Sequence, residues 1–509
     1  MGGNYEKSTF NQLMEVMAKL DAMEAEHKKD RKEIKSLTAE VSSLRKENAR
    51  LREEVSVLKQ ENTVLKQKCE LLEKENALLR EDNERLKRNA NNNSSNSSNP
   101  PSKDQNKPPK APNTYNGRKP TQKKPGAQPG HKGHNLSKAD VEEKIRQGLF
   151  VHRLEEIGKP GRPYITRYRL DLDIRTIATE VRIYEDDNGK FQVPDELRAD
   201  VSYGEKVKAI TAFLYSEGVV ANDRICTFIN SISGDILGLS TGSVYGFCRK
   251  FSGACAAVCS RIEERLLDAY EICTDATPVK VNGKQTFIRN FSTEKDVLYW
   301  GCDKKDLNTL KKIRIFREFA GIFTHDHETA IYHFGTGHSE CNVHIGRYLQ
   351  KNTEETGNIW SRQLSGFLNG MNHARNELKV TGGTGFTREQ LERYAARYDE
   401  IIERGLEQNK NTRGRIAKRE EKALLNRLKK YKENHLLFLY DFRVHFSNNV
   451  SEKDLRICKN RQKMAGGFRT ADGRQMYCAI MSFIETLKRR KLNIFQGIVN
   501  LMNGTPVIE

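Results

Sequence analysis

Apolar residues recur at every seventh position in the N-terminal part of the chain. Leucines keep this spacing from Leu37 to Leu86, and the position three residues before each leucine carries a β-branched residue, cysteine or asparagine. This pattern favours a parallel two-stranded coiled coil, in which each buried asparagine fixes the register. We therefore predict a leucine zipper over residues 31–88, preceded by a separate helix over residues 1–30. The predicted dimerisation residues are Leu37, Leu44, Leu51, Leu58, Leu65, Leu72, Leu79, Leu86, Asn48, Asn62, Asn76 and Asn83.

Charged residues flank the leucine positions with a sign pattern that suits two parallel chains. In a homodimer, an acidic residue of one chain would face a basic residue of the other, as in the pairs 40–45, 47–52 and 54–59. Each pair contributes only ~0.2–1 kcal/mol, but the consistent sign selects the partner and its direction. A single solvated helix is the competing interpretation, and it gives no reason for the leucine spacing.

Residues 89–135 are predicted to be a disordered basic linker. They begin with a run of asparagine, serine and proline that cannot bury a core, and basic residues interleaved with proline and glycine follow. The segment is either a spacer or an arm that contacts phosphates, and we expect both roles. Its candidate DNA-binding residues are Lys119, Lys123, Lys124 and Lys132.

Two apolar, strand-like runs each end in an aspartate. The first run precedes Asp275, and a second strand-like run follows Asn282–Gly283, a dipeptide that predicts a tight hairpin. The later run 321–324 leads into Asp326. For a single aspartate, a solvated strand end or a turn cap explains the position, and a metal ligand at the mouth of a sheet is the alternative.

A glutamate near a predicted helix start supplies a third acid. Asn449 is a good N-cap, and Glu452 would then be the third helical residue, as in a capping box. Three carboxylates gathered at one place repel one another unless cations separate them, and Mg²⁺ prefers such oxygen ligands. Basic residues continue along the same predicted helix, and they are further candidates for DNA contact: Arg456, Lys459, Arg461 and Lys463.

Composition favours a polyanionic partner in a reducing compartment. The 509 residues carry a net charge of +19, with the basic residues in clusters, and such clusters suit nucleic acid. No stretch is apolar enough to span a membrane, and no signal-peptide core opens the sequence. The ten cysteines include no Cys-x-x-Cys pair, so we expect free thiols and a cytoplasmic protein.

The region between the linker and Asp275 predicts two small domains. Residues 136–200 are expected to form a β module with strands at 164–170 and 177–184. Residues 201–265 are expected to be a helix-turn-helix-like DNA-binding domain, whose second helix begins after Ser240 or Thr241 and ends in Arg249 and Lys250. An ordinary helical hairpin packed on the core is the alternative.

Several longer stretches together resemble the transposases of the insertion sequence 66 family. They are TDATPVKVNGK, GIFTHDHETAIYHFG, HSECNVHIGRYLQ, FSNNVSEKDLRICKNRQK and SFIETLKRRKLNIFQGI. The resemblance covers most of the chain from about residue 90 onward. That family is similar to Asp-Asp-Glu recombinases with a ribonuclease H-like core, and the resemblance places its three catalytic, metal-binding acids at Asp275, Asp326 and Glu452.

This sequence departs from the family pattern in three places. Ala276 stands where the family commonly has glutamate, and Ser447 stands where it often has aspartate. The family also carries a cysteine-rich zinc module after the linker, whereas here no cysteine lies between Cys69 and Cys226. We therefore expect no zinc in residues 136–200. His338, Cys341 and His344 form either a metal site or an ordinary polar helix face.

The predicted fold is a multidomain α+β protein. The ribonuclease H-like α/β core would comprise residues 266–355 and 441–509, interrupted by a helical insertion over residues 356–440 that divides near residues 409–411. The coiled coil and the helix-turn-helix-like domain would precede this core.

The resemblance implies a DNA transposase that binds element ends and performs metal-dependent strand cleavage and strand transfer. Two Mg²⁺ ions, replaceable by Mn²⁺, would serve the three acids. Expected partners are double-stranded DNA, namely terminal inverted repeats and target DNA, a second copy of the chain, and accessory proteins of the same element. The expected location is the bacterial cytoplasm, in association with the nucleoid. A non-catalytic, zipper-dimerised DNA-binding protein and a structural protein built on the rod are the alternatives.

Overall fold

The computed structural model describes residues 3–92, 96, 136–157, 162, 165–505 and 507–508. They divide into two compact units: the long helix α1 (Gly3–Asn91), and most of the chain that follows it. None of the described helices combines the length and the apolar character that a membrane span needs.

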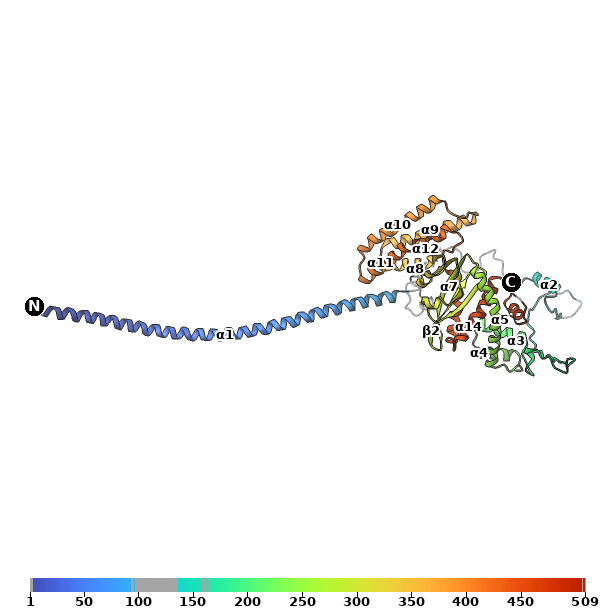
Figure 1. Ribbon diagram of the computed structural model, residues 1–509, viewed down its shortest axis with the longest axis horizontal. Coiled ribbons are helices and arrows are strands. Elements are labelled where there is room, and N and C mark those ends of the chain that lie inside the picture. Colours follow the sequence, from blue (N-terminus) through green and yellow to red (C-terminus); the bar gives the residue numbers. More distant parts are fainter. Residues whose placement is uncertain are drawn as a thin grey trace. The chain divides into compact units, whose positions relative to one another are not determined.

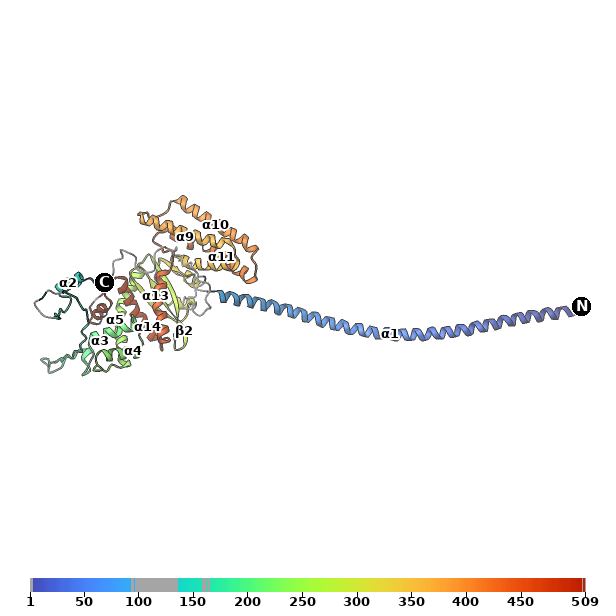
Figure 2. The same cartoon turned by 180° about the vertical axis from the view of Figure 1, so that it is seen from behind.

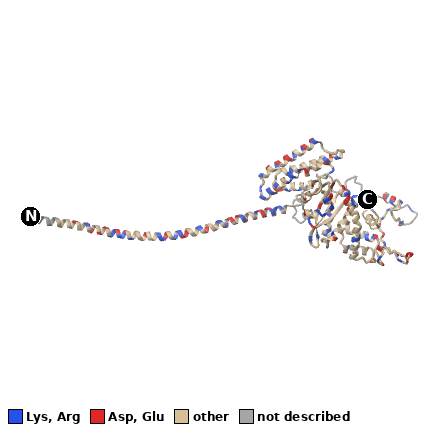
Figure 3. Ribbon diagram, in the orientation of Figure 1, with Lys and Arg blue, Asp and Glu red and all other residues tan. Residues whose placement is uncertain are grey.

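Helix α1 runs without a break through the two segments that the sequence analysis separated at residue 30. Its leucine positions are exposed in the single chain, with Leu44 at 53% and Leu58 at 54%. Figure 3 shows basic and acidic residues alternating along its length. A charged helix with an exposed apolar stripe fits a coiled coil, which buries that stripe against another helix.

A five-stranded mixed sheet forms the centre of the second unit (Figure 1). Its strands lie in the order β3-β2-β1-β4-β5; the first three are antiparallel, and β4 and β5 run parallel to β1. Asn282 and Gly283 join β1 to β2 with φ angles of 47° and 75°, which confirms the predicted hairpin. The strands are β1 (Glu271–Val281), β2 (Lys284–Ser292), β3 (Val297–Cys302), β4 (Ile322–His325) and β5 (Gly337–Glu340).

Helices pack on this sheet and around it to form the first hydrophobic core. Helix α14 covers the edge strand β3: Ser482 Oγ accepts from the Tyr299 N–H at 2.8 Å, and Thr486 Oγ1 accepts from the Val297 N–H at 3.2 Å. These bonds satisfy backbone groups that an open edge would leave unpaired. Figure 2 shows α13 and α14 beside the strands near β2. The helices are α3 (Glu205–Ser216), α4 (Asn222–Ile232), α5 (Thr241–Leu267), α6 (Leu307–Leu310), α7 (Arg314–Glu318), α13 (Asn449–Ala465), α14 (Ala471–Arg489) and α15 (Ile494–Met502).

A second hydrophobic core lies in the helical insertion, centred on the buried side chains of Trp360 and Tyr398. Helix α8, which the sequence analysis placed with the sheet, contributes Ile345 and Leu349 to this second core. Thr387 caps α10 in a capping box, and the break after α10 lies where the sequence predicted it. The helices are α8 (Asn342–Thr356), α9 (Ile359–Val380), α10 (Arg388–Lys410), α11 (Arg415–Lys430) and α12 (Lys432–Tyr440).

The predicted β strands at 164–170 and 177–184 are wrong for their described residues, which form neither helix nor strand. Their apolar side chains, such as Ile165 at 79% and Ile177 at 80% exposed, pack against nothing. Two isolated strands without a partner layer are at best marginally stable. The described part of residues 136–200 holds only α2 (Lys138–Arg146), the 3₁₀ turn η2 (Asp195–Leu197) and one bridge, Glu185 to Phe191.

The predicted helix-turn-helix-like domain, residues 201–265, contains α3, α4 and most of α5, and α5 is longer than predicted. Ser240 caps α5 by accepting from the Ser243 N–H at 3.1 Å, as expected. The helix then continues past Arg249 and Lys250 to Leu267 instead of ending there. It buries a long apolar stripe in the first core, and this packing explains why two basic residues do not end it.

Candidate active site

Asp275 lies inside β1, not at its end as the sequence suggested. It pairs with Asn290 of β2, whereas pairing of β1 with β4 stops at Cys273 and Thr324. The apolar run of β1 therefore ends where its parallel neighbour ends, although the strand itself continues to Val281.

Asp326 lies directly after β4, which ends at His325. Because Cys273 of β1 aligns with Thr324 of β4 in a parallel register, Asp275 and Asp326 stand equally far along adjacent strands. Residues two apart along a strand point to the same face. The two acids therefore lie side by side at the carboxyl end of β4.

Glu452 reaches these strands from the first turn of α13. The predicted N-cap was one residue late: Asn448 is the N-cap, and its side chain makes no capping bond. Its Nδ2 instead donates to the Thr274 carbonyl at 3.0 Å and to Asp326 Oδ1 at 3.3 Å. Glu452 is therefore the fourth helical residue, outside a capping box, and its carboxylate is available to the site.

Asn290 of β2 fixes the start of α13 on the sheet. Its Oδ1 accepts from the Asp275 N–H at 3.2 Å and from Ser451 Oγ at 2.7 Å. Its Nδ2 donates to the Ser451 carbonyl at 3.1 Å. One buried amide thus holds both the backbone of the first acid and the residue that precedes the third.

Four side chains form a compact cluster in the resulting space. The ligand atoms of Asp326, Cys341, His344 and Glu452 all lie within 4.8 Å of one another. His344 Nδ1 is 3.2 Å from Asp326 Oδ1 and 3.4 Å from Glu452 Oε1. Asp275 is not a member of this group, but it is close enough to Asp326 to feel its charge. The structure therefore brings the second and third predicted acids together, with the first beside them.

The electrostatics of the cluster favour an added positive charge. Burial, and then the Asp326 carboxylate, raise the pKa of Asp275 to about 6. Burial opposes protonation of His344, but the nearby Asp326 carboxylate and Cys341 thiol outweigh burial and raise the pKa of this imidazole to about 11. Like charges in a partly dry space destabilise one another.

His344 Nδ1 lies close to both acids, whichever protonation state the ring adopts. Arg347 Nη1 lies 3.1 Å from His344 Nε2, and a guanidinium only donates hydrogen bonds. This contact favours a neutral ring with its proton on Nδ1, whereas the raised pKa favours a ring protonated on both nitrogens. In both states Nδ1 carries a proton, close to both carboxylates but without hydrogen-bond geometry to either.

The donor set fits a divalent cation bound through oxygen. Glu452 Oε1 is buried and has no hydrogen-bond partner among the described residues, so it offers an unused lone pair to an ion. Hard cations prefer carboxylate ligands of this kind. Cys341 instead takes part in packing: its buried Sγ accepts from the Asn448 N–H at 3.2 Å, and burial raises the pKa of its thiol.

The predicted trio of His338, Cys341 and His344 is only partly brought together. Cys341 and His344 join the acid cluster. His338 lies in β5, where its ring is 4.7 Å from that of Tyr332 and 5.5 Å from that of His325. It therefore belongs to an aromatic contact group rather than to the cluster.

Three of the four predicted basic residues on α13 share one exposed face with Glu452. Arg456, Lys459 and Lys463 follow at helical spacing and are exposed. Arg461 lies on the opposite face, where its Nη1 donates to the Val220 carbonyl at 2.9 Å and its guanidinium lies 4.2 Å from the Tyr215 ring centroid. It is buried and engaged, which removes it from the predicted DNA-binding set.

The other predicted DNA-binding residues are separate from this cluster. Arg249 and Lys250 are exposed on α5. The predicted arm residues lie outside the described part of the chain: Lys119, Lys123, Lys124 and Lys132.

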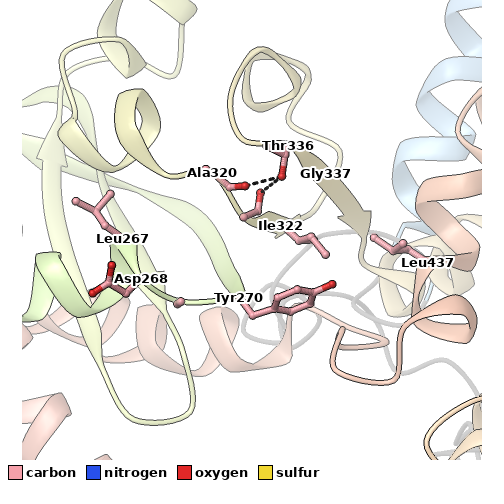
Figure 4. Close-up of a pocket in the computed structure, with 10 residues that line it drawn as sticks. Leu267, Asp268, Tyr270, Ala320, Ile322, Thr336, Gly337 and Leu437 are labelled. Atoms are coloured by element: carbon pink, nitrogen blue, oxygen red, sulfur yellow. Dashed lines mark hydrogen bonds between the residues drawn. The ribbon is translucent and has the colours of Figure 1, made fainter.

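A cavity of about 580 Å³ lies at the other end of the parallel strands (Figure 4). Its lining includes Tyr270, Ile322 and Gly337, which stand where β1, β4 and β5 begin. Thr336 closes one wall by donating to the Ala320 carbonyl at 2.5 Å. Because the acids follow the carboxyl ends of these strands, the cavity is distinct from the acid cluster.

The sequence did not reveal the residues that orient the three acids or alter their pKa values. Asn448 and Asn290 were visible only as polar residues near strand and helix ends. The Arg289 guanidinium donates to Thr274 Oγ1 at 3.2 Å and also bonds Glu328, and its charge and that of Lys305 lower the pKa of Asp275 against the effect of burial. An arginine within the apolar, strand-like run 287–291 was the one signal in the sequence that could have indicated Arg289.

Comparisons with known families identify one family over more than half of the chain. A model described as "Transposase IS66 family" matches residues 203–476, more than half of the chain and all three acids. A second model, described as a family of unknown function (DUF6444), matches residues 26–137. No curated protein and no solved structure gives a match. The chain belongs to the IS66 family of transposases, enzymes that bind and cleave DNA and generally use divalent metal ions.

Proposed function

We propose that this protein is an Asp-Asp-Glu transposase with a ribonuclease H-like core, which cuts the ends of its element and joins them to target DNA. One observation carries the proposal: Glu452 and Asp326, far apart in sequence, have ligand atoms within 4.8 Å of one another, with Asp275 on the adjacent strand. The five-stranded mixed sheet that positions two of these acids supports the proposed core.

The three acids would hold two Mg²⁺ ions, which Mn²⁺ can replace. Bound in this way, such ions activate a water or a 3′-hydroxyl and stabilise the leaving oxygen of a phosphodiester. Asn448 orients Asp326, and Asn290 orients both β1 and the start of α13. His344 Nδ1 lies 3.2 Å from Asp326 Oδ1 and 3.4 Å from Glu452 Oε1, and a positive charge on this ring would lower the mutual repulsion of the two acids before an ion binds.

DNA would lie along the exposed basic face of α13. Arg456, Lys459 and Lys463 continue the face that presents Glu452, so phosphates bound there lead toward the acids. The α5 residues Arg249 and Lys250, together with the linker, would bind the element ends, and α1 would join two subunits in a parallel zipper. Accessory proteins of the same element are a further proposed partner, and the bacterial nucleoid is the proposed location.

Cleavage of the element's own terminal repeats tests this proposal. Wild-type protein with Mg²⁺ or Mn²⁺ should nick an oligonucleotide duplex that carries the terminal repeat, and should join it to a target plasmid. Asp275→Ala, Asp326→Asn and Glu452→Gln should each lower cleavage by roughly 1000-fold or more, with DNA binding in EDTA unchanged. Glu400→Gln, an exposed glutamate on α10, is the matched control and should cut normally.

The opposite result would favour the non-catalytic alternative. If the wild type binds the terminal repeats in a salt-dependent manner but never cuts them with either metal, the protein is a zipper-dimerised DNA-binding protein. If the three variants cut as well as the wild type, the proposed acids are wrong.

A further inference from the structure

Glu340, the last residue of β5, is wholly buried and accepts hydrogen bonds on both carboxylate oxygens. Its Oε1 accepts from His327 Nδ1 at 2.6 Å and from the Tyr332 hydroxyl. Its Oε2 accepts from Arg427 Nη2 at 2.5 Å and from His435 Nε2 at 3.1 Å. We call these five residues the Glu340 junction.

The four donors come from two different parts of the fold. His327 lies in the loop after β4, and Tyr332 lies in the 3₁₀ helix η3 (Thr329–His333). Arg427 and His435 lie on α11 and α12 of the helical insertion. One carboxylate therefore links the insertion to the loop that carries Asp326.

Joining two elements through a buried carboxylate carries a large desolvation penalty. Transfer of the charge from water costs several kcal/mol, and apolar side chains of similar volume often give equal or greater stability. Burial works against ionisation of Glu340, but bonds from His327 and His435 and the charge of Arg427 outweigh burial and hold the pKa of Glu340 well below its ordinary value. The junction contributes a fixed geometry that apolar packing would not provide.

That geometry acts on the residue next to Asp326. His327 has a φ of 62°, a left-handed conformation that is unfavourable for a residue with a Cβ. Its ring is held by the Glu340 carboxylate and by the ring of Tyr431, 4.9 Å away between centroids. Because Asp326 directly precedes His327, the Glu340 junction holds the chain immediately after Asp326.

We propose that Glu340 is a positioning residue through which the helical insertion holds Asp326 in its metal-binding orientation. This inference rests on the proposed function, because it takes Asp326 to be a metal ligand. The insertion is then part of the catalytic apparatus, although Arg427 and His435 lie outside the acid cluster.

Binding of Mn²⁺ to the full-length protein without DNA tests the inference independently of activity. The free-Mn²⁺ signal in electron paramagnetic resonance gives the dissociation constant. Arg427→Met should weaken Mn²⁺ binding by roughly 10-fold, the size typical of lost outer-sphere partners, and Arg427→Lys should recover part of the loss. Lys429→Met on the same helix, whose ion pair with Glu403 is exposed, is the matched control and should bind as the wild type does.

A kinetic readout separates positioning from loss of structure. In cleavage assays, Arg427→Met should raise the apparent KM for Mn²⁺ while kcat at saturating Mn²⁺ stays within about twofold of the wild type. Tyr332→Phe removes a single donor from Glu340 and provides a milder variant should Glu340→Gln or Arg427→Met fail to fold. It should weaken Mn²⁺ binding by about two- to fivefold.

The possible failures are distinguishable. If Asp326→Asn abolishes Mn²⁺ binding but folded Arg427→Met and Tyr332→Phe bind with wild-type affinity, the positioning role is refuted and the proposed function stands. If Asp326→Asn itself binds Mn²⁺ with wild-type affinity, Asp326 is not a metal ligand. Both the proposed site and this inference are then refuted.

Discussion

Asp275 carries a charge that the folded protein tolerates poorly without a bound cation. Burial and the adjacent Asp326 raise its pKa from 3.8 to about 6, so the folded state holds this proton more tightly than the unfolded state does. Asp275→Asn should therefore stabilise the metal-free protein by about 1–3 kcal/mol at pH 7.5. Urea unfolding in EDTA measures the gain.

The sign of this effect follows from proton linkage. Between pH 4 and about 6 the folded wild type binds more protons at Asp275 than the unfolded chain does, so its stability falls as the pH rises. The advantage of Asp275→Asn should shrink as the pH is lowered from 6 toward 4. Asp441→Asn should instead destabilise the folded protein at neutral pH. A bond from Arg443 lowers the pKa of Asp441 to about 2, so the folded state favours the ionised carboxylate. A destabilised Asp275→Asn at pH 7.5 would contradict the prediction.

At the residue scale, the sequence indicated the three candidate acids but not their surroundings. Residue types and strand and helix patterns drew attention to Asp275, Asp326 and Glu452, and the resemblance to a known family suggested their roles. The roles of Asn448 and His344 arise from contacts between segments distant in sequence, and no local pattern records such contacts. Arg461 was wrongly predicted to contact DNA, because its basic side chain alone does not show which face of the helix is buried.

The hairpin between β1 and β2 depends on two residues with positive φ. Gly283 has a φ of 75°, and a Cβ added there would meet nothing within 4 Å. Gly283→Ala should therefore cost only the conformational penalty, about 1 kcal/mol, measured as a lower midpoint of urea unfolding. Gly246→Ala, in a helix and equally open, should be neutral or slightly stabilising. If both variants lost the same stability, the positive φ of Gly283 would not be the cause of the loss.

The zipper prediction can be tested with two valines of α1. Val55 and Val64 are 48% and 51% exposed in the single chain, but only Val55 lies at a repeating core position. Val55→Glu should raise the dimer dissociation constant by roughly 100-fold or more, because it buries two like charges. Val64→Glu should leave the dimer intact in light scattering or sedimentation of the full chain. Similar behaviour of the two variants would refute the predicted register.

Elements with a strong local signal were predicted well, and those that depend on a packing partner were not. The capped α10, the hairpin and the start of α5 each follow from short-range chemistry. Residues 164–170 and 177–184 are of types that favour strands. They have no surface on which a sheet could pack, and their described residues form no strand. The full length of α5 likewise comes from its burial in the first core.

For the whole molecule, the basic face of α13 should set part of the salt dependence of DNA binding. Combined replacement of Arg456, Lys459 and Lys463 by alanine removes up to three phosphate contacts. The slope of log affinity against log salt should then fall in magnitude by about 2–3. Arg461→Ala should instead lower stability, because Arg461 bonds the Val220 carbonyl. An unchanged slope in the triple variant would place DNA elsewhere.

The order of the acids along the chain has a consequence during synthesis. Helix α1 ends at Asn91, far before the third acid, whereas Glu452 is added only after the whole helical insertion. A ribosome product that stops before α13 would keep the zipper but lack the third carboxylate. If the proposed zipper forms, such a fragment would combine with a complete subunit into a dimer that has only one set of three acids.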